Sequence, residues 1–257
     1  MPDVVAFGEL LIDFVPTEAG LGVGGTALWE RAPGGAPANV AVGLARLGVT
    51  AAFSGMVGDD PFGHYLADVL RDNAVDLRGL RFSAQARTAL AFVALQPDGQ
   101  RDFVFYRHPS ADMLFGPADL DEALIAACSI FHCGSISVIS EPNRAATYRA
   151  LELARQHGRL ISIDPNLRLP LWPSAEAARA GIRALLPHAD VIKISEDEAQ
   201  FLTGEADLAR AARQLWHPSL KLLAITEGGA GCTYVTAAGL GRVAGFSVQT
   251  VDTTGAG

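Results

Sequence analysis

The second half of the chain repeats one pattern, in which a short apolar run precedes a longer stretch of helical character. Apolar runs of strand length recur at residues 129–133, 160–164, 191–194 and 222–226. Residues 141–157 lie between the first two runs and have the length of a helix, which we expect Gly158 to end. Strands that alternate with helices form a parallel sheet with helices on its faces. We therefore predict an α/β fold with a doubly wound, mainly parallel sheet.

The first half of the chain keeps part of this pattern. Strands are predicted at residues 4–8 and 51–57, and helices at residues 38–47 and 61–72. Asp60 precedes the second helix and is expected to cap it.

Two segments of the first half do not fit a βαβ core. One is the glycine-rich stretch 17–35, and the other is a hairpin of residues 88–95 and 101–107 around the turn sequence Pro97-Asp98-Gly99. We expect a small β lid from about residues 10–33 and 88–108, within a single domain covering residues 1–257. The hairpin contains Phe92, Phe103 and Phe105. Because an isolated two-stranded hairpin is only marginally stable in water, we expect the lid to pack against a second copy of the chain in a homodimer.

Composition excludes several classes of partner. The chain has 257 residues, of which 49% are apolar, and a formal net charge of -8. An acidic total argues against nucleic-acid binding and against binding to an anionic membrane surface. Three scattered cysteines suit neither a disulfide framework nor a zinc site, and no signal peptide or apolar membrane span is visible. We expect a cytoplasmic protein.

The candidate site residues follow predicted strands, because ligands of open α/β sheets bind beyond the carboxyl ends of the strands. Asp13 follows an apolar strand and either binds sugar hydroxyls as a charged acceptor or is a surface turn residue. Gly34 and Gly35 precede a helix that contains Asn39, an arrangement that suits a polyol or a plain loop-to-helix junction.

Aromatic and basic residues mark two further segments. Phe105 and Arg107 end the hairpin, where they either line a substrate pocket or belong to a half-buried lid strand. Asn166 and Arg168 lie within five residues that also contain Asp164, just after a strand. Such polar density at that end of a strand is more often functional than structural.

Two segments suit phosphate and nucleotide. Lys193 can neutralise phosphate, and Glu198 can hold magnesium through water, although Ser195 followed by acidic residues also reads as an ordinary helix cap. The glycine-rich loop that begins with Thr226 and Glu227 and contains Gly228 and Gly231 either contacts a nucleotide or is a β-turn. The chain contains no G-x-x-x-x-G-K-[ST] motif.

The final residues read Asp252-Thr253-Thr254-Gly255-Ala256-Gly257. A glycine-rich turn that opens a helix directs several backbone N–H groups at one point and forms an anion site. We expect such a site at Gly255, Ala256 and Gly257.

Taken in order, these motifs resemble the ribokinase-like, phosphofructokinase-B-type carbohydrate kinases over the whole chain. Residues 34–41 look like the N-terminal signature of that family, and residues 251–257 look like the opening of its C-terminal signature. Within the family, residues 8–16, 106–114 and 164–172 are similar to the fructokinase branch.

The resemblance implies ATP and Mg²⁺ as cofactors and a small sugar as substrate. It assigns sugar contacts to Asp13, Gly34, Gly35, Asn39, Phe105, Arg107, Asn166 and Arg168. It assigns contacts with phosphate, magnesium and nucleotide to Lys193, Ser195, Glu198, Thr226, Glu227, Gly228 and Gly231. It assigns the anion hole to Gly255, Ala256 and Gly257. Asp252 and Thr254 occupy the region that often holds a monovalent cation such as K⁺ in relatives.

The chain departs from the family pattern at two points. Ser195 stands where many relatives carry Asn, a change that is common in the fructokinase branch. The catalytic Asp of the family directly follows Gly-Ala-Gly, whereas this sequence stops at Gly257. We therefore expect fructose phosphorylation from the full-length parent and almost no activity from these 257 residues. The alternatives are a kinase for 2-keto-3-deoxygluconate or another small sugar, and a non-catalytic sugar-binding relative.

Overall fold

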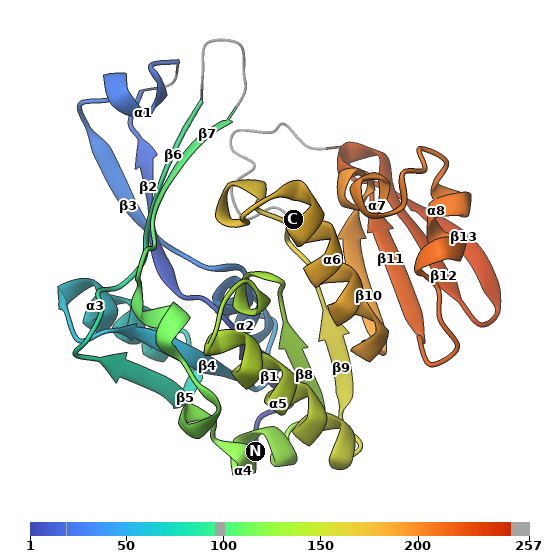
Figure 1. Cartoon of the computed structure of the whole chain (residues 1–257), viewed down its shortest axis with the longest axis horizontal. Coiled ribbons are helices and arrows are strands. Elements are labelled where there is room, and N and C mark those ends of the chain that lie inside the picture. The colour runs from blue at the N-terminus through green and yellow to red at the C-terminus, as the bar shows by residue number, and fades with distance from the viewer. Residues whose placement is uncertain (19, 96–100, 248–257) are drawn as a thin grey trace.

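The computed structural model describes residues 1–18, 20–95 and 101–247. Its larger sheet has nine strands in the order β13-β12-β11-β10-β9-β8-β1-β4-β5 (Figure 1). The strands are β1 Val4–Phe7, β4 Ala51–Gly58, β5 Asp76–Ser83, β8 Ile130–Cys133, β9 Leu160–Ile163, β10 Val191–Ser195, β11 Leu222–Thr226, β12 Gly231–Thr236 and β13 Gly239–Ala244.

Most strand pairs in this sheet are parallel, which confirms the predicted fold class. All pairs from β5 across to β11 are parallel, whereas β12 pairs antiparallel with both β11 and β13. The strands predicted at residues 51–57, 191–194 and 222–226 are present with ends within one residue of the prediction. Sequence analysis did not identify β5, β12 or β13. These strands lie at the two margins of the sheet, where burial imposes a weaker apolar pattern, and β13 is largely exposed.

The helices follow the predicted pattern. The α-helices are α1 Gly22–Gly25, α2 Ala36–Arg46, α3 Pro61–Asp72, α4 Glu122–Ala127, α5 Asn143–Gln156, α6 Ala175–Leu185, α7 Glu196–Thr203 and α8 Leu208–Leu215. Short 3-10 turns are η1 Ala111–Leu114, η2 Pro117–Asp119, η3 Ile136–Val138, η4 Leu169–Leu171, η5 Leu186–His188 and η6 Gly228–Ala230. Helix α3 has the predicted bounds, and Asp60 caps it as predicted by accepting hydrogen bonds from the N–H groups of Phe62 and Gly63.

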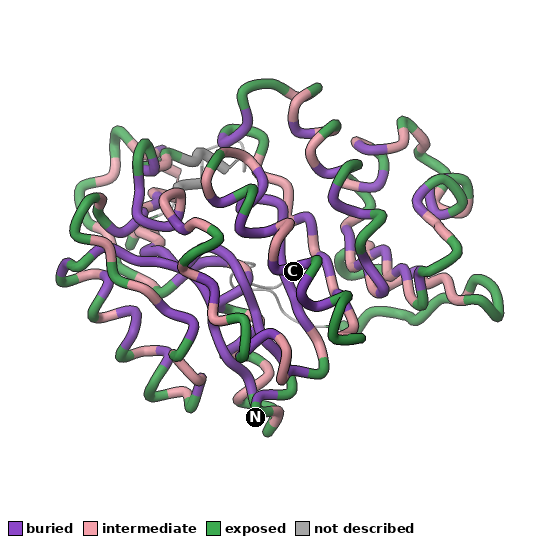
Figure 2. The backbone as a smooth tube through the Cα atoms, turned by 60° about the horizontal axis from the view of Figure 1, so that its bottom comes forward, coloured by how far each residue is buried: buried purple, intermediate pink, exposed green. Residues whose placement is uncertain are grey.

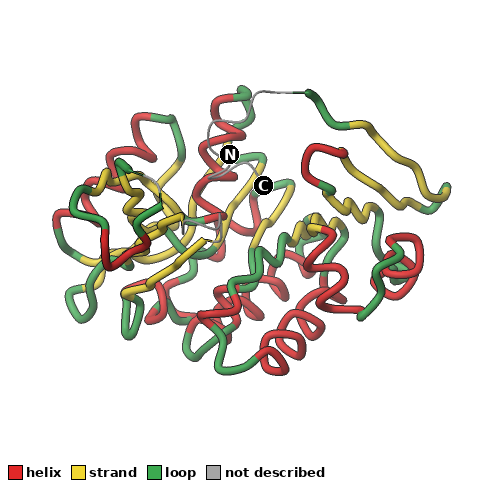
Figure 3. Tube along the Cα trace, turned by 90° about the horizontal axis from the view of Figure 1, so that it is seen from above, coloured by secondary structure: helices red, strands yellow, loops and turns green. Residues whose placement is uncertain are grey.

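Two apolar clusters cover the two faces of the large sheet. Phe53 and Leu66 belong to the cluster beneath α2 and α3, and both are fully buried. The larger cluster fills the other face and contains Phe131, Ile163 and Ile192. Full burial of such side chains stabilises the fold by roughly 1.5–3 kcal/mol each. Helices accordingly lie on both sides of the strands in Figure 3, and the buried segments in Figure 2 run through the centre of the molecule.

A second, four-stranded sheet projects from the first, and we refer to it as the lid (Figure 1). It contains β2 Leu11–Pro16, β3 Trp29–Gly34, β6 Leu90–Leu95 and β7 Arg101–Tyr106, in the order β3-β2-β6-β7. Strands β6 and β7 form the predicted antiparallel pair. The turn sequence predicted between them, residues 97–99, lies outside the described residues.

The two faces of the lid have different apolar contacts. On one face, Leu11 and Ala91 form a small buried cluster that Phe105 packs against. On the other, the rings of Phe14 and Phe92 stack with centroids 4.8 Å apart, and Trp29 packs edge-on against Phe92.

Candidate functional site

Asp13 lies within β2, rather than after a strand as predicted, and its carboxylate lies against Gly34, which is diagonally opposite on β3 of the lid. A Cβ atom at residue 34 would collide with the carboxylate of Asp13, so a side chain there would displace that carboxylate. Burial raises the pKa of Asp13 to about 6, and the positive charge of Arg168 opposes this shift. Because Arg168 follows β9 of the large sheet, the structure brings a carboxylate of the lid within electrostatic reach of a cation from the core.

The loop between β3 and α2 contains the other two sugar-binding candidates of the N-terminal half. Gly35 has φ 104°, in the region that favours glycine, and a side chain there would collide with the backbone carbonyl of Glu9. Helix α2 begins at Ala36, and Asn39 is exposed near its start. The position of Asn39 leaves its amide accessible to a polar ligand.

An ion pair joins the middle of β10 to the residue that follows β9. Lys193 Nζ lies 3.1 Å from Asp164 Oδ2, with both side chains partly exposed. The Asp164 carboxylate also accepts a hydrogen bond from the N–H of Asn166, 3.2 Å away. Asn166 has φ 46°, a left-handed conformation that non-glycine residues adopt rarely and mostly at turns or functional sites.

Glu198 holds two loops of the site together. Its Oε2 accepts a hydrogen bond from the N–H of Ser195 at 2.8 Å, and the Ser195 hydroxyl accepts one from the N–H of Glu198 at 3.2 Å. This reciprocal pair is a capping box at the start of α7, the structural alternative that the sequence left open. Glu198 Oε1 accepts a further hydrogen bond from the N–H of Leu167, 2.6 Å away. Direct magnesium binding by Glu198 would compete with these bonds, whereas contact through water uses the remaining lone pairs.

Glu227 and Gly231 have structural partners in the loop after β11. The Glu227 carboxylate accepts a hydrogen bond from the Thr233 hydroxyl and pairs with Arg242, each at 2.7 Å. Gly231 has φ 109°, and a side chain there would collide with the carbonyl of Val243. Both residues therefore have a structural role in the loop, and their contact with a nucleotide stays a prediction.

Two other nucleotide candidates in this loop are more open. Gly228 is exposed with φ 54°, and a Cβ there would meet no atom within 4 Å. Thr226 ends β11 beside Ser195 of β10, in register with it. The backbone of Gly228 is therefore accessible to a nucleotide.

Arg107 differs most from its expected environment. Its side chain is 2% exposed, and its Nε and Nη2 donate hydrogen bonds to Asp112 Oδ2 at 2.8 and 2.5 Å. A direct sugar contact would require Arg107 to leave this pair, so that contact stays a prediction. Phe105, two residues earlier, packs in the small cluster of the lid.

Sequence reasoning missed two residues near the site, Glu9 and Asp112. Both carboxylates are buried, and Asp112 is the partner of Arg107. The signal for Glu9 was present in the sequence, because its charge interrupts the apolar run of residues 4–15.

The C-terminal candidates Asp252, Thr254, Gly255, Ala256 and Gly257 lie outside the described residues. Within the described ranges, no group of three or more His, Cys, Asp or Glu side chains is arranged to hold a metal ion. The same ranges contain no helix that is both long and apolar enough to cross a membrane.

Comparison with known proteins assigns the family. The model of the pfkB family of carbohydrate kinases matches residues 1–257. The chain belongs to this family. It is 55% identical over 255 residues to "Fructokinase-2" of Solanum lycopersicum, which covers 99% of this chain and 78% of that protein. It is 57% identical over 257 residues to "Probable fructokinase-7" of Arabidopsis thaliana, which covers 99% of this chain and 75% of that protein.

Solved structures of pfkB-type kinases have the same fold. The ATP-bound fructokinase of Xylella fastidiosa superposes with a TM-score of 0.86 at 36% identity, covering 98% of this chain and 77% of that one. A putative ribokinase II of E. coli in complex with ATP and Mg²⁺ superposes with a TM-score of 0.89 at 28% identity, covering 100% of this chain and 82% of that one. The fold of this pfkB chain is therefore one that binds ATP in relatives.

Proposed function

We propose that the full-length protein transfers a phosphoryl group from ATP to D-fructose and forms fructose 6-phosphate. The observation that carries this proposal is the 55% identity to a fructokinase over almost the whole chain. The structure supports it with a carboxylate, Asp13, and a glycine loop at the base of the lid, which suit the hydroxyl groups of a neutral sugar.

These positions support the following sugar-binding roles. Ionised Asp13 accepts charge-assisted hydrogen bonds from sugar hydroxyls, each worth roughly 1.5–3 kcal/mol. Gly34 and Gly35 allow the sugar to approach the backbone, and Asn39 donates and accepts beside them. Phe105, Asn166 and Arg168 complete the pocket.

The nucleotide lies across the carboxyl ends of β10 and β11. Lys193 neutralises phosphate charge, and Thr226 and Gly228 contact the nucleotide. Magnesium accompanies ATP and contacts Glu198 through water, because both carboxylate oxygens already accept backbone hydrogen bonds. We propose, from the resemblance alone, that a monovalent cation such as K⁺ binds at Asp252 and Thr254.

The chemical step needs a base and an anion hole. The base that the resemblance implies follows Gly257, and it takes the proton of the sugar's primary hydroxyl, a contribution of about 10²–10⁴-fold in rate. Backbone N–H groups of Gly255, Ala256 and Gly257 stabilise the developing negative charge, and each such donor is worth about 10²–10³-fold.

Comparison of sugars tests the substrate assignment. In the form extended through the aspartate expected after Gly257, kcat/KM is measured for fructose, glucose, ribose and 2-keto-3-deoxygluconate. We expect fructose to be preferred. A tenfold preference for the acidic sugar, about 1.4 kcal/mol of transition-state stabilisation, would overturn the assignment. Because Arg107 is paired with Asp112, Arg168 is the cation of this pair of candidates that remains for the carboxylate of an acidic sugar.

We also propose a homodimer that forms through the lid. Tyr106 and Val104 are 64% and 36% exposed on the lid, and Tyr106 lies edge-on to Phe92. A second lid packed on this aromatic face would bury these side chains. Sedimentation of the protein at micromolar concentration measures the oligomeric state, and a monomer would contradict the proposal.

A cytoplasmic location is proposed on the basis of the free thiols. Cys128, Cys133 and Cys232 are all unpaired, as expected in a reducing compartment. Subcellular fractionation tests this, and a relative that is 55% identical, "Probable fructokinase-6, chloroplastic" of Arabidopsis thaliana, identifies the alternative compartment to assay.

A further inference from the structure

The turn after β8 holds one peptide group of the loop after β9, which we call the 164–168 loop. Both the N–H and the hydroxyl of Ser135 donate hydrogen bonds to the carbonyl of Pro165, at 3.1 and 2.5 Å. The N–H of the same peptide group belongs to Asn166 and donates to the Asp164 carboxylate at 3.2 Å. Ser135 is fully buried, so its two bonds are made in a dry environment. The peptide group between Pro165 and Asn166 is therefore held at both ends.

The next peptide group of the loop is held as well. The N–H of Leu167 donates a hydrogen bond to Glu198 Oε1 at 2.6 Å. Because peptide groups are planar, the orientations of the two groups that flank Asn166 set its φ and ψ. Asn166 has φ 46°, and a non-glycine residue stays in this left-handed region where its surroundings over-determine the backbone. Ser135 on one side and Glu198 on the other thus set the direction in which the Asn166 side chain leaves the backbone.

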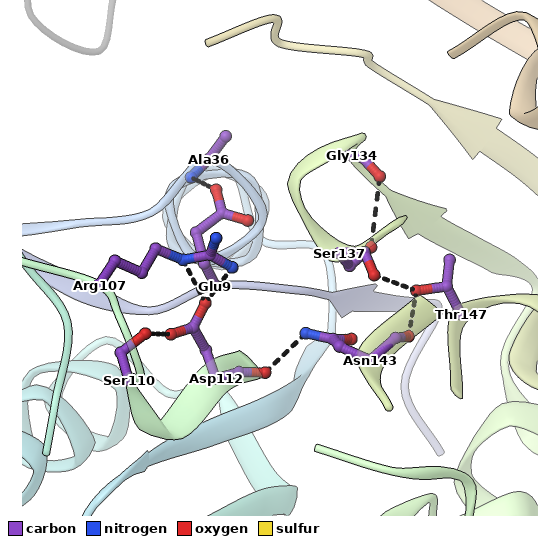
Figure 4. Close-up of polar contacts among 9 residues, drawn as sticks. All are labelled: Glu9, Ala36, Arg107, Ser110, Asp112, Gly134, Ser137, Asn143 and Thr147. Carbon is purple, nitrogen blue, oxygen red and sulfur yellow. Dashed lines mark hydrogen bonds and ion pairs between the residues drawn. The ribbon is translucent and has the colours of Figure 1, made fainter. Parts of the chain in front are cut away.

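Ser135 is itself fixed to the core of the protein. It precedes η3, and its carbonyl accepts a hydrogen bond from the N–H of Val138 at 3.2 Å. Within this turn, Ser137 donates its hydroxyl to the Gly134 carbonyl at 3.4 Å, and its own carbonyl accepts the Thr147 hydroxyl at 3.2 Å (Figure 4). Thr147 is fully buried in α5, a helix that packs in the larger apolar cluster. The turn that carries Ser135 is therefore anchored to a packed helix.

We propose that Ser135 is a positioning residue whose hydroxyl fixes the backbone at Asn166 and so directs the Asn166 amide toward the sugar. The inference rests on the proposed function, in which Asn166 lines the pocket for fructose. Without the hydroxyl, the buried carbonyl of Pro165 loses the shorter of its two hydrogen bonds from Ser135. The peptide group before Asn166 then has more freedom to rotate, and the amide is no longer held in one direction.

Ser135→Ala tests this, because it removes the hydroxyl and keeps the N–H. The fructose Kd and the MgATP Kd are measured by calorimetry on the form extended beyond Gly257. We expect the fructose Kd to rise about tenfold, since a misdirected polar group loses its hydrogen bond to the ligand. The MgATP Kd should not change, because Lys193 keeps its ion pair with Asp164.

Ser137→Ala is the matched control. Ser137 is 2% exposed and lies in the same turn, but its hydroxyl bonds Gly134 instead of the 164–168 loop. This variant should bind fructose and MgATP as the wild type does. Equal fructose affinities of Ser135→Ala and Ser137→Ala would overturn the proposal.

A double-mutant cycle with Asn166→Gly separates positioning from a general loss of stability. Glycine adopts the left-handed conformation without strain and has no amide to direct. In the Asn166→Gly background, Ser135→Ala should therefore change the fructose Kd by less than about twofold. The same loss of affinity in this background as in the wild-type background would show that Ser135 does not act through Asn166.

Amide hydrogen exchange in the absence of ligand tests the loop independently of fructose. The N–H of Asn166 should exchange about tenfold faster in Ser135→Ala than in the wild type, and Ser137→Ala should match the wild type. An unchanged exchange rate at Asn166 would overturn the positioning role. If exchange changes as expected but the wild type does not bind fructose, the proposed function fails and the positioning of Asn166 stands.

Ser135→Cys provides a second variant if Ser135→Ala does not fold. A thiol is a weaker hydrogen-bond donor than a hydroxyl, so the fructose Kd should rise by a smaller factor, about threefold. Wild-type fructose affinity in Ser135→Cys would overturn the proposal.

Discussion

The ammonium group of Lys193 and the carboxylate of Asp164 meet at 3.1 Å, joining β10 to the end of β9 at the edge of the sheet where ligands of this architecture bind. The same ammonium acts on a third residue. The pKa of His132 is lowered to about 4, mainly by burial and in addition by the positive charge of Lys193. Burial, with a smaller contribution from Lys193, therefore keeps this histidine neutral at physiological pH, and Lys193 itself remains partly exposed to a ligand.

In the form extended beyond Gly257, Lys193→Met is expected to raise the KM for ATP about tenfold, because one phosphate-neutralising charge is lost, equivalent to about 1.4 kcal/mol. The fructose Kd should not change. Loss of the lysine charge should also raise the pKa of His132, which an NMR titration of the ring measures. Unchanged ATP kinetics would leave Lys193 a purely structural partner of Asp164.

Asp13→Asn is expected to impair sugar use and to stabilise the fold at neutral pH. The pKa of Asp13 in the folded state, about 6, is above its unfolded value, so its ionisation opposes folding as pH rises from about 4 through 6. The substitution removes this cost, and at pH 7 the free energy of unfolding should increase by about 1–3 kcal/mol. Fructose kcat/KM should fall roughly 10–100-fold because the charged acceptor is lost.

Urea denaturation at pH 7 and pH 4 checks the stability effect, which should disappear at the lower pH. An equal effect at both pH values would show that ionisation of Asp13 is not its cause. Unchanged fructose kinetics would leave Asp13 a structural residue of β2 that packs against Gly34.

Gly34→Ala should reduce fructose affinity at least tenfold, because the added methyl group collides with the Asp13 carboxylate and displaces it. Gly43→Ala is the matched control, since Gly43 lies within α2 and a Cβ there meets no atom within 4 Å. The control should raise stability by about 0.5–1 kcal/mol through helix propensity and leave fructose binding intact. Calorimetric titration with fructose compares the two, and equal affinities would contradict the close approach at Gly34.

Asp60→Ala should destabilise the protein by about 1–3 kcal/mol, since it removes the cap of α3 and leaves the buried N–H of Thr88 without its acceptor. Burial acts to raise the pKa of Asp60, but hydrogen bonds from Thr88, Gly63 and Phe62 outweigh it and lower the pKa. Its contribution to stability is therefore present above the unfolded pKa near 4 and lost as pH falls below that value.

Thermal unfolding between pH 7 and pH 2.5 measures this dependence. The difference in stability between wild type and Asp60→Ala should shrink at the acidic end. A constant difference across this range would mean that the charge of Asp60 does not contribute.

The sequence by itself determined the fold class and the local features of the chain. Apolar runs alternating with amphipathic stretches are a property of neighbouring residues, and they predicted the parallel sheet, the bounds of α3 and its cap at Asp60. The glycines before α2 were found for the same reason, because close backbone approach and positive φ are local requirements.

Only the tertiary structure decided which polar groups became partners. The chain path placed Asp112 beside Arg107 as a buried partner, and Glu198 acquired Leu167 as a partner from 31 residues away. In the sequence, Glu9 only interrupts an apolar run. In the structure, its carboxylate accepts a hydrogen bond from the N–H of Ala36, which lies 27 residues away along the chain. The physical reason is that a buried charge is costly unless it is paired, and its partner is whichever polar group the fold places beside it. The distance between two residues in space cannot be read from their separation in the sequence.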